Sequence, residues 1–222
     1  MPSDPQSSPH ASDAPDADIR ARSIKKYSSR AAAYDQTCGP TWPIRLATID
    51  RLQLQSGQHV LGVGCGTGLS LALLRQAVGD RGLVDGVEQS PEMMQQARQK
   101  VQAAGWNNVV LHEAAAQDLQ LIQPIDAFLF HYTHDILRSE LALNRLLGFA
   151  KPGARVAIAG IKYFPGWLAP LNLWVYLKNY GYNGAPGELK TPWDRISPRL
   201  SDWQISPTQW GMGYIASGRV RE

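Results

Sequence analysis

The stretch that decides the fold is Val60 to Ser70, VLGVGCGTGLS, where four glycines alternate with other residues directly after an apolar pair. Glycine costs roughly 0.5–1 kcal/mol relative to alanine inside regular structure, so a cluster of glycines needs a reason. A plain turn from strand to helix needs one or two glycines. Three at strict alternate positions, Gly64, Gly66 and Gly68, favour a loop whose backbone lies against a ligand.

Outward from this loop, short apolar runs alternate with segments of helical period. The expected strands cover residues 58–63, 82–88, 109–112, 126–130 and the run after the Pro-Gly turn at 152–153. The expected helices cover residues 69–78, a segment from Pro91 with Ser90 as N-cap and Gly105 as stop, and a segment ending near Leu147. Strands that are apolar on both faces and separated by helices predict an α/β fold with a parallel sheet covered on both sides.

The chain of 222 residues is long enough for one domain with a sizeable core. Residues 1–18, mostly Pro, Ser, Ala and Asp, are expected to be a disordered tail. Residues 19–52 are expected to form an N-terminal helical lid segment, and residues 53–222 the core. The core holds an aromatic insertion at about 163–200 and ends in SDWQISPTQWGMGYIASGRV, which predicts an antiparallel hairpin at the sheet edge.

Composition narrows the class of protein. Hydrophobic residues at 44%, charged residues at 18% and a net charge of +3 are typical of an ordinary soluble globule. The absence of a Lys/Arg tract gives no support to a nucleic-acid partner. Two cysteines, Cys38 and Cys65, form neither a disulfide framework nor a four-ligand zinc site, so we expect no metal and a cytoplasmic location. No run reaches the ~18 apolar residues of a membrane span.

The spacing of the glycines excludes two familiar nucleotide motifs. The dinucleotide pattern G-x-G-x-x-G fails from either Gly62 or Gly64, and the phosphate loop fails because no Lys follows Gly68. The spacing is G-x-G-x-G instead. Glu88, twenty positions beyond Gly68, ends the next expected strand, where a carboxylate can accept both hydroxyls of a ribose. The two features together indicate a nucleoside-containing ligand.

Five stretches, VLGVGCGTGLS, GVEQSPEMMQQAR, HEAAAQDL, IDAFLF and KPGARVAIAG, occur in an order and spacing that resemble the class I S-adenosylmethionine-dependent methyltransferases. The resemblance runs from about Arg45 to Gly160. It implies a Rossmann-like, doubly wound, mostly parallel seven-stranded sheet with a C-terminal antiparallel hairpin. It also implies S-adenosylmethionine as cofactor, with S-adenosylhomocysteine as product.

The resemblance also assigns roles to residues around the cofactor. The loop Gly64–Gly68, with Cys65 and Gly66, would pack against the methionine part. Glu88 would hold the ribose and Gln89 would lie against the adenine. The remaining expected cofactor residues are Ala116 and Gln117 beside the adenine ring, and His131 beside the methionyl end.

Two positions depart from the family pattern. The family usually has an acidic residue where Gly62 stands, and commonly Asp where Ala115 stands. The first loss removes a charge that helps to orient the loop and the ammonium group of the cofactor. Asp35 is a candidate to replace it. The same departures leave open a non-catalytic module with a relic cofactor site.

The segment HYTHDIL, His131 to Leu137, follows the fourth expected strand, where the methyl group should lie. A histidine titrates near neutral pH and suits a general base. We expect His134 in that role, oriented by Asp135, with His131 closer to the cofactor. The alternative is that His134 starts the next helix and Asp135 complements the helix dipole.

The acceptor pocket should come from the two flanks. Tyr27 and Tyr34 are seven residues apart, hence on one helical face, and are expected to line the acceptor site from a lid. Tyr163, Trp167 and Trp174 of the aromatic insertion suit a flat or hydrophobic acceptor. Packing of these residues on the core or sheet edge, or a homodimer contact, stays open, and the oligomeric state is undetermined.

These features favour methylation of an oxygen or nitrogen on a small hydrophobic or aromatic molecule. Five cations and no acid between residues 19 and 34 raise an alternative, a phospholipid (ethanolamine-type) N-methyltransferase that contacts the membrane surface through this segment. A nucleic-acid methyltransferase is not favoured, because the Asn-Pro-Pro-aromatic motif is missing after the fourth strand.

Overall fold

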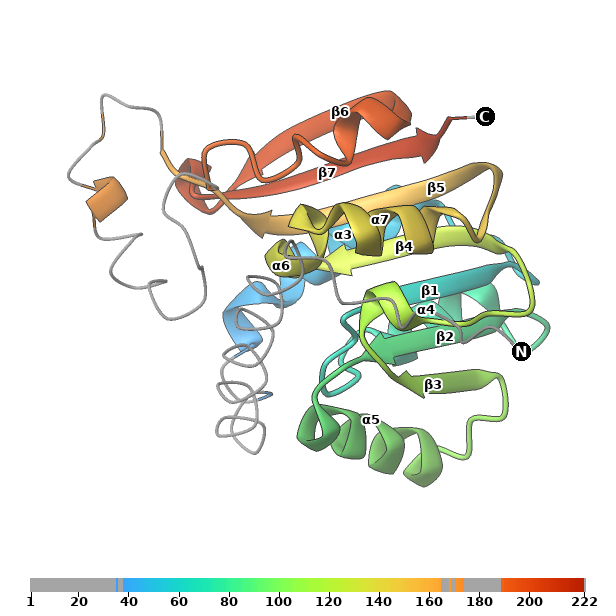
Figure 1. Cartoon of the computed structure of the whole chain (residues 1–222). Coiled ribbons are helices and arrows are strands. Elements are labelled where there is room, and N and C mark those ends of the chain that lie inside the picture. Colours follow the sequence, from blue (N-terminus) through green and yellow to red (C-terminus); the bar gives the residue numbers. More distant parts are fainter. Residues whose placement is uncertain (1–34, 36–37, 165–167, 169–170, 174–188, 222) are drawn as a thin grey trace, which may run out of the picture.

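A seven-stranded sheet forms the centre of the molecule (Figure 1). The computed structural model describes residue 35 and residues 38–164, 168, 171–173 and 189–221. The strands are β1 His59–Val63, β2 Leu83–Glu88, β3 Val109–Glu113, β4 Ile125–His131, β5 Ala150–Ile161, β6 Leu200–Thr208 and β7 Gly213–Val220. The five apolar runs and the terminal hairpin predicted from the sequence all form strands.

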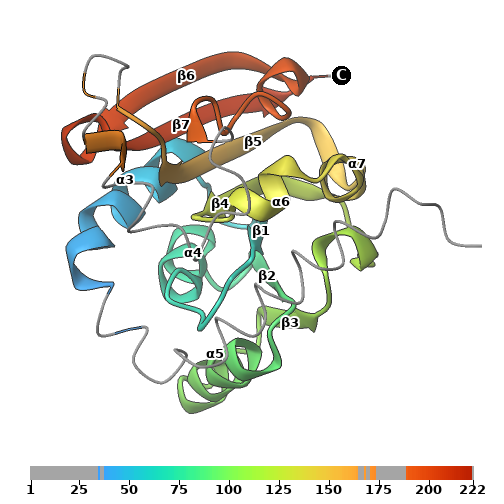
Figure 2. The ribbon, with the colours of Figure 1, turned by 60° about the vertical axis from the view of Figure 1, so that its left-hand side comes forward.

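The strand order is β3-β2-β1-β4-β5-β7-β6. Strands β1 to β5 pair in parallel, whereas β7 is antiparallel to both β5 and β6. Figure 2 shows the β6–β7 hairpin at one end of the sheet and β3 at the other. The order reverses between β1 and β4, and ligands of open α/β sheets bind beyond the carboxyl ends of the strands at such a reversal. The predicted fold is confirmed.

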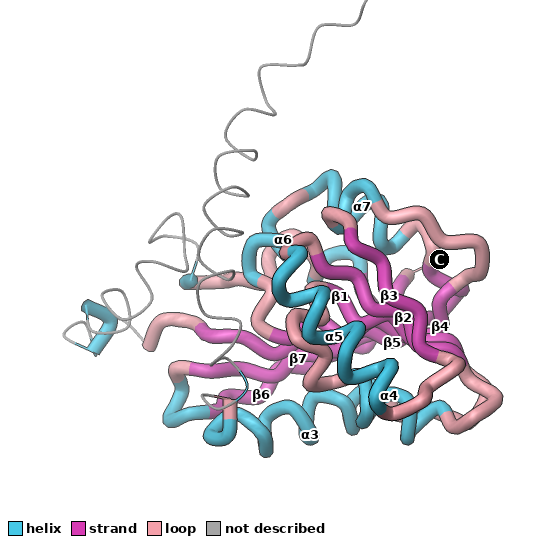
Figure 3. The backbone as a smooth tube through the Cα atoms, turned by 90° about the horizontal axis from the view of Figure 1, so that it is seen from below, coloured by secondary structure: helices cyan, strands magenta, loops and turns pink. Residues whose placement is uncertain are grey.

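Helices cover both faces of the sheet, and Figure 3 shows α3 and α7 on opposite sides. The helices are α3 Trp42–Leu52, α4 Leu71–Val78, α5 Pro91–Ala103, α6 His134–Arg138 and α7 Glu140–Leu147. One buried cluster joins Leu52 of α3, Leu74 of α4 and Met94 of α5 to the strands. A second cluster joins Leu143 of α7 and the large aromatic Phe128 of β4 on the other face. The double covering explains why both faces of the central strands are apolar.

Helix α3 belongs to the segment that the sequence predicts as a lid, yet it is part of the core. It packs against β4, β5 and β7, and Leu52 at its C-terminal end is fully buried. Residues 19–34 of the same segment lie outside the described residues. Within the described part of the chain, no helix is long and apolar enough to cross a bilayer.

The helix predicted to run to Leu147 is divided at Ser139, so the prediction of one continuous helix is wrong. Ser139 has an extended backbone (φ −86°, ψ 110°), which ends α6, and its hydroxyl accepts a hydrogen bond from the N–H of Ala142 in the first turn of α7. The prediction at α5 is confirmed, because Ser90 caps that helix by accepting from the N–H of Met93 and Pro91 begins it. Both serines satisfy N–H groups that have no partner within their own helix.

A buried polar cluster connects the three strands at the β3 end of the sheet. Asp85 of β2 is 3% exposed, and its carboxylate binds Nε2 of His59 in β1 and Nε2 of His112 in β3, the latter at 2.6 Å. Burial opposes the ionisation of Asp85, but the hydrogen bonds from His112 and His59 and their positive charges outweigh it, so the pKa of Asp85 lies below its ordinary value.

Candidate active site

The glycine loop connects β1 to α4, and its glycines lack a side chain for two different reasons. Gly64, Gly66 and Gly68 have φ values of 58°, 56° and 83°, in the left-handed region that glycine adopts at least cost. A Cβ on Gly64 would lie 2.6 Å from Cγ2 of Thr133, and a Cβ on Gly68 would lie 2.9 Å from Cδ1 of Leu71. A Cβ on Gly66 would meet nothing within 4 Å. Gly64 and Gly68 therefore serve packing, whereas Gly66 borders open space.

Glu88 at the end of β2 supports the loop from the neighbouring strand. Its carboxylate accepts hydrogen bonds from the N–H of Gly66 at 3.1 Å and from the N–H of Ser90 at 2.8 Å. Burial raises the pKa of Glu88, and the negative charge of Asp135 adds to that effect against the lowering by these N–H groups. A carboxylate has about four acceptor positions, and the N–H of Gln89 also contributes, so capacity remains for a further donor such as a ribose hydroxyl.

Asp35 connects the N-terminal part of the chain to the far side of the loop. Its carboxylate accepts a hydrogen bond from the hydroxyl of Thr67 and forms an ion pair with Lys100 of α5. The ammonium of Lys100 also donates to the carbonyl of Thr67 at 2.8 Å. Asp35 is thus a carboxylate beside the loop, as predicted, but its charge is paired with Lys100.

The chain leaves β4 through His131, Tyr132 and Thr133, directly opposite the glycine loop. Tyr132 has a φ of 60°, which is uncommon for a residue with a side chain and sharply changes the direction of the backbone. Nε2 of His131 is buried and has no hydrogen-bond partner among the described residues. Burial, followed by the charge of Arg45, lowers the pKa of His131 to about 3, so its imidazole is neutral at physiological pH.

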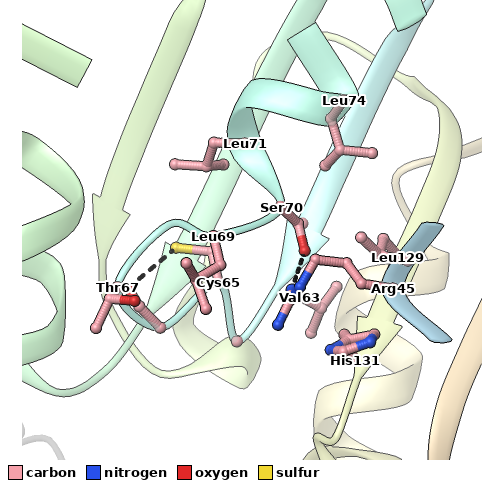
Figure 4. A pocket seen from close by; sticks show the side chains of 13 residues that line it. Arg45, Val63, Cys65, Thr67, Leu69, Ser70, Leu71, Leu74, Leu129 and His131 are labelled. Atoms are coloured by element: carbon pink, nitrogen blue, oxygen red, sulfur yellow. Dashed lines mark hydrogen bonds between the residues drawn. The ribbon is translucent and has the colours of Figure 1, made fainter. Parts of the chain in front are cut away.

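A small cavity of about 40 Å³ separates the loop from β4 (Figure 4). Gly62 and the glycine loop form one wall, and Ser70 and Leu74 form another. Arg45 of α3 and His131 project into the same space in Figure 4. Two nitrogen-bearing side chains from different elements thus meet at the carboxyl ends of β1 and β4.

His134 turns away from this cavity. Its Nε2 lies 3.0 Å from the N–H of Ile161 and 3.2 Å from the carbonyl of the same residue, so the β5 backbone occupies that nitrogen. Burial lowers the pKa of His134 to about 4. In the described part of the chain, no hydrogen bond joins His134 to Asp135, whose pKa is raised by burial.

Comparison with known proteins finds similarity to several methyltransferases. The family model described as Protein-L-isoaspartate(D-aspartate) O-methyltransferase matches residues 25–132. A protein-L-isoaspartate O-methyltransferase of Methanococcoides burtonii is 32% identical over 94 residues, 42% of this chain and 46% of the relative. A demethylmenaquinone methyltransferase of Shouchella clausii is 30% identical over 138 residues, 60% of this chain and 56% of the relative. The chain spans about half the length of these curated relatives.

Solved structures share the architecture. A SAM-dependent methyltransferase from Aquifex aeolicus superposes with a TM-score of 0.62 at 20% identity, over 86% of this chain and 98% of the other. A Haemonchus contortus N-methyltransferase in complex with S-adenosylhomocysteine superposes with a TM-score of 0.68 at 14% identity, over 88% of this chain and 58% of the other. The family match and these structures support the predicted family, the class I S-adenosylmethionine-dependent methyltransferases. The predicted family, enzyme type and cofactor are confirmed.

The site of this methyltransferase fits S-adenosylmethionine on observations of its own residues. Open space above Gly66 admits a ligand to the backbone. The carboxylate of Glu88 lies beside it with acceptor capacity to spare, and His131 lines the cavity with a buried Nε2 that has no partner among the described residues. Cys65, within the loop, is half-buried, and burial raises the pKa of its thiol, so the thiol is neutral.

The other predicted cofactor residues surround the carboxyl ends of β2 and β3. Gln89 follows Glu88 and is half-buried. Ala116 begins a short turn after β3, Ala116–Asp118, and is buried in the core on the α7 side, while Gln117 is half-buried. Ala115, where the family commonly has Asp, is 3% exposed. Their contacts with the adenine stay predictions.

Only one of the predicted acceptor residues, Tyr163, belongs to the part of the chain that the structure describes. Tyr27, Tyr34, Trp167 and Trp174 lie outside the described residues. Tyr163 follows β5 at the carboxyl edge of the sheet, half-buried, with its N–H donating to the carbonyl of Leu189 at 2.8 Å. The residue that sequence reasoning missed is Arg45, which marked only the edge of the resemblance. The signal available was a cation at a position of α3 that shares a helical face with the apolar Ile49 and Leu52.

Proposed function

We propose that this methyltransferase acts on an oxygen or nitrogen of a small hydrophobic or aromatic molecule. The observation that carries the proposal is the apolar surface beyond β5. Leu171 and Leu173 are 44% and 60% exposed. Asn172 between them hydrogen-bonds to the backbone of Phe164, accepting from its N–H at 2.7 Å and donating to its carbonyl at 3.0 Å. Exposed apolar side chains held at the carboxyl edge of the sheet favour an apolar acceptor.

The extent of the family match supports a small-molecule acceptor over a protein. The isoaspartate family model matches residues 25–132, which end at the exit of β4 and hold the glycine loop and Glu88. Residues beyond 132, which carry the apolar surface, have no counterpart in that match. The relative with the longer matched stretch is named for demethylmenaquinone, a hydrophobic quinone that is neither a protein nor a nucleic acid.

The residues of the chain have a limited chemical task. S-adenosylmethionine supplies, when bound, a methyl group on a positively charged sulfur. The loop and Glu88 orient the cofactor, and the exit of β4 places polar groups beside the acceptor. Of the two histidines, the geometry favours His131 for contact with the acceptor, because it lines the cavity and its Nε2 has no partner among the described residues, whereas the backbone of Ile161 occupies Nε2 of His134. With a pKa of about 3 its imidazole is neutral and a weak base, so it would orient the acceptor by accepting a hydrogen bond rather than hold the proton.

A methyl-transfer assay tests the acceptor class. The purified full chain is incubated with S-adenosylmethionine labelled in the methyl group and three acceptors in parallel: a small phenol or hydroquinone, an isoaspartyl peptide, and ribosomal RNA. We expect label in the organic-soluble small molecule. Label in the peptide or the RNA, with none in the small molecules, would overturn the proposal.

Variants test the assignment of the histidines. His131→Gln should lower the rate constant of methyl transfer at least tenfold, while a direct titration shows that S-adenosylhomocysteine still binds. His134→Gln should lower thermal stability, because it disturbs a buried contact with β5, and should alter the rate less. The reverse order would return the catalytic role to His134.

The two alternatives from the sequence have separate tests. Loss of vesicle binding on removal of residues 1–34, together with label in ethanolamine phospholipids, would support the lipid enzyme. Cofactor binding without transfer to any acceptor would support the relic site.

A further inference from the structure

Arg45 is a buried cation next to the cofactor loop. It belongs to α3, is 6% exposed, and its Nη1 donates a hydrogen bond to the hydroxyl of Ser70, the residue that precedes α4. This bond holds the guanidinium at the end of the glycine loop. The same side chain lines the cavity with Gly64, Gly66 and His131. Its charge therefore acts on whatever enters that space.

The opposite wall of the cavity has lost a negative charge. Gly62 stands where the family usually has an acidic residue, and it lines the same cavity as Arg45. A Cβ at this position would lie 3.7 Å from Cδ1 of Leu74 and 3.8 Å from Cβ of Cys65, which are ordinary contact distances. Sterics do not demand glycine at position 62. The cavity thus contains a cation where the family pattern puts an anion.

A positive rather than a negative charge in the cavity determines which of the two charged groups of an amino acid can bind there. A guanidinium repels an ammonium group and binds a carboxylate through two parallel N–H groups. In a buried site the attraction is stronger than in water, because few water molecules screen it. The cavity holds a small polar group. A ligand with an amino-acid end would therefore enter with its carboxylate toward α3.

We infer that Arg45 binds the carboxylate of the methionyl end of the cofactor and so replaces, with opposite charge, the acid missing at Gly62. The inference rests on the proposed cofactor binding at the glycine loop. It adds the residue that recognises the amino-acid end and the group that it recognises. Ser70 is then a positioning residue, because it holds the guanidinium by its hydroxyl.

Ligands that lack the carboxylate test this inference without an activity measurement. Isothermal titration compares S-adenosylhomocysteine, decarboxylated S-adenosylmethionine, which keeps the ammonium, and 5′-methylthioadenosine, which lacks both groups. Arg45→Met should weaken binding of S-adenosylhomocysteine at least about thirtyfold, as expected for truncating one partner of a buried charge pair. Binding of 5′-methylthioadenosine should change less than about threefold, and decarboxylated S-adenosylmethionine should bind at least as tightly as to the wild type, because its ammonium is no longer repelled. Unchanged binding of 5′-methylthioadenosine also shows that the variant is folded.

Two further variants sharpen the test. Arg45→Lys keeps the charge but loses the planar pair of donors, and should recover part of the affinity for S-adenosylhomocysteine. Arg51 lies on the same helix but contacts Gln204 and Ser206 of β6. The Arg51→Gln variant should therefore bind all three ligands as the wild type does.

The outcomes separate the inference from the proposed function. If the wild type binds S-adenosylhomocysteine and Arg45→Met binds it equally well, the inference fails and the cofactor site stands. If Arg45→Met lowers the affinity for all three ligands by the same factor, Arg45 has a structural role only, and the inference also fails. If the wild type binds none of the three, the proposed function fails and the inference fails with it.

Discussion

Gly66→Ala separates the two uses of the glycine loop, folding and ligand binding. The backbone at position 66 is left-handed (φ 56°), and this conformation costs an alanine about 1 kcal/mol. No atom lies within 4 Å of the new Cβ, so no steric clash within the protein adds to this cost. Gly105→Ala is a matched control. Gly105 has φ 63° and the same open surroundings, but lies beyond α5, outside the site.

The two variants should lose the same stability and differ in ligand binding. In Gly66→Ala the methyl group occupies the space in which the cofactor meets the backbone. Forcing one extra methyl into a packed contact costs about 1–3 kcal/mol, which corresponds to a roughly 5- to 150-fold increase in Kd. Gly105→Ala should leave Kd unchanged.

Urea denaturation of the two variants gives the stability change, and calorimetric titration with S-adenosylhomocysteine gives the Kd. Equal unfolding free energies together with weaker binding in Gly66→Ala alone would support a direct contact between loop and cofactor. If Gly66→Ala bound S-adenosylhomocysteine within twofold of Gly105→Ala, the open space above Gly66 would not be the ligand site. The assignment of the loop would then be wrong.

Three further predictions concern stability. Asp85→Asn should cost about 3 kcal/mol in urea denaturation at pH 7, because it breaks a buried charge cluster. The stability from its lowered pKa is present above the ordinary value of 3.8 and lost as pH falls through the folded value, so the variant should decline less than the wild type below about pH 4. Ser139→Ala should cost about 1 kcal/mol in the same assay, because α7 loses its cap; no change would show that the cap is dispensable. Trp210→Gly should raise the unfolding free energy by about 0.5–1 kcal/mol, since Trp210 is fully exposed at φ 59° and its removal relieves backbone strain without loss of packing; a lower melting temperature would contradict this.

The parts of the site that sequence predicts are local in the chain. Gly64, Gly66 and Gly68 fall within five residues, and Glu88 ends the very next strand. The distance from loop to carboxylate is fixed by one helix and one turn, so linear spacing reports spatial proximity. The strands were predictable for a similar reason, since apolar runs buried on both faces leave a continuous hydrophobic signal.

The parts that sequence did not predict depend on tertiary packing or on unusual backbone geometry. His131 and His134 stand three residues apart, and sequence alone gave no reason for the second to leave the site. The positive φ of Tyr132 turns the chain, and His134 ends against the backbone of Ile161. Arg45 becomes part of the site only because α3 packs against β4 and β5, and no short-range pattern reports that contact. The break at Ser139 did carry a local signal, a serine followed by an acid at the start of a helix, hidden within a longer apolar period.

The division between predictable and unpredictable residues follows the division of chemical tasks. A cofactor shared by many proteins is recognised at the ends of β1 and β2, where topology leaves few solutions, and the family match covers that half. In the proposed function, the acceptor is recognised by the exit of β4 and by residues after β5, where the match no longer extends. Arg45 lies between the two, since it comes from a helix that packs against β4 and β5 but points toward the loop. If it binds the carboxylate of the cofactor, then cofactor affinity in this chain depends on how α3 is seated. Substitutions on the buried face of α3, such as Ile49→Ala, should then weaken the binding of S-adenosylhomocysteine more than the binding of 5′-methylthioadenosine, although Ile49 itself does not line the cavity.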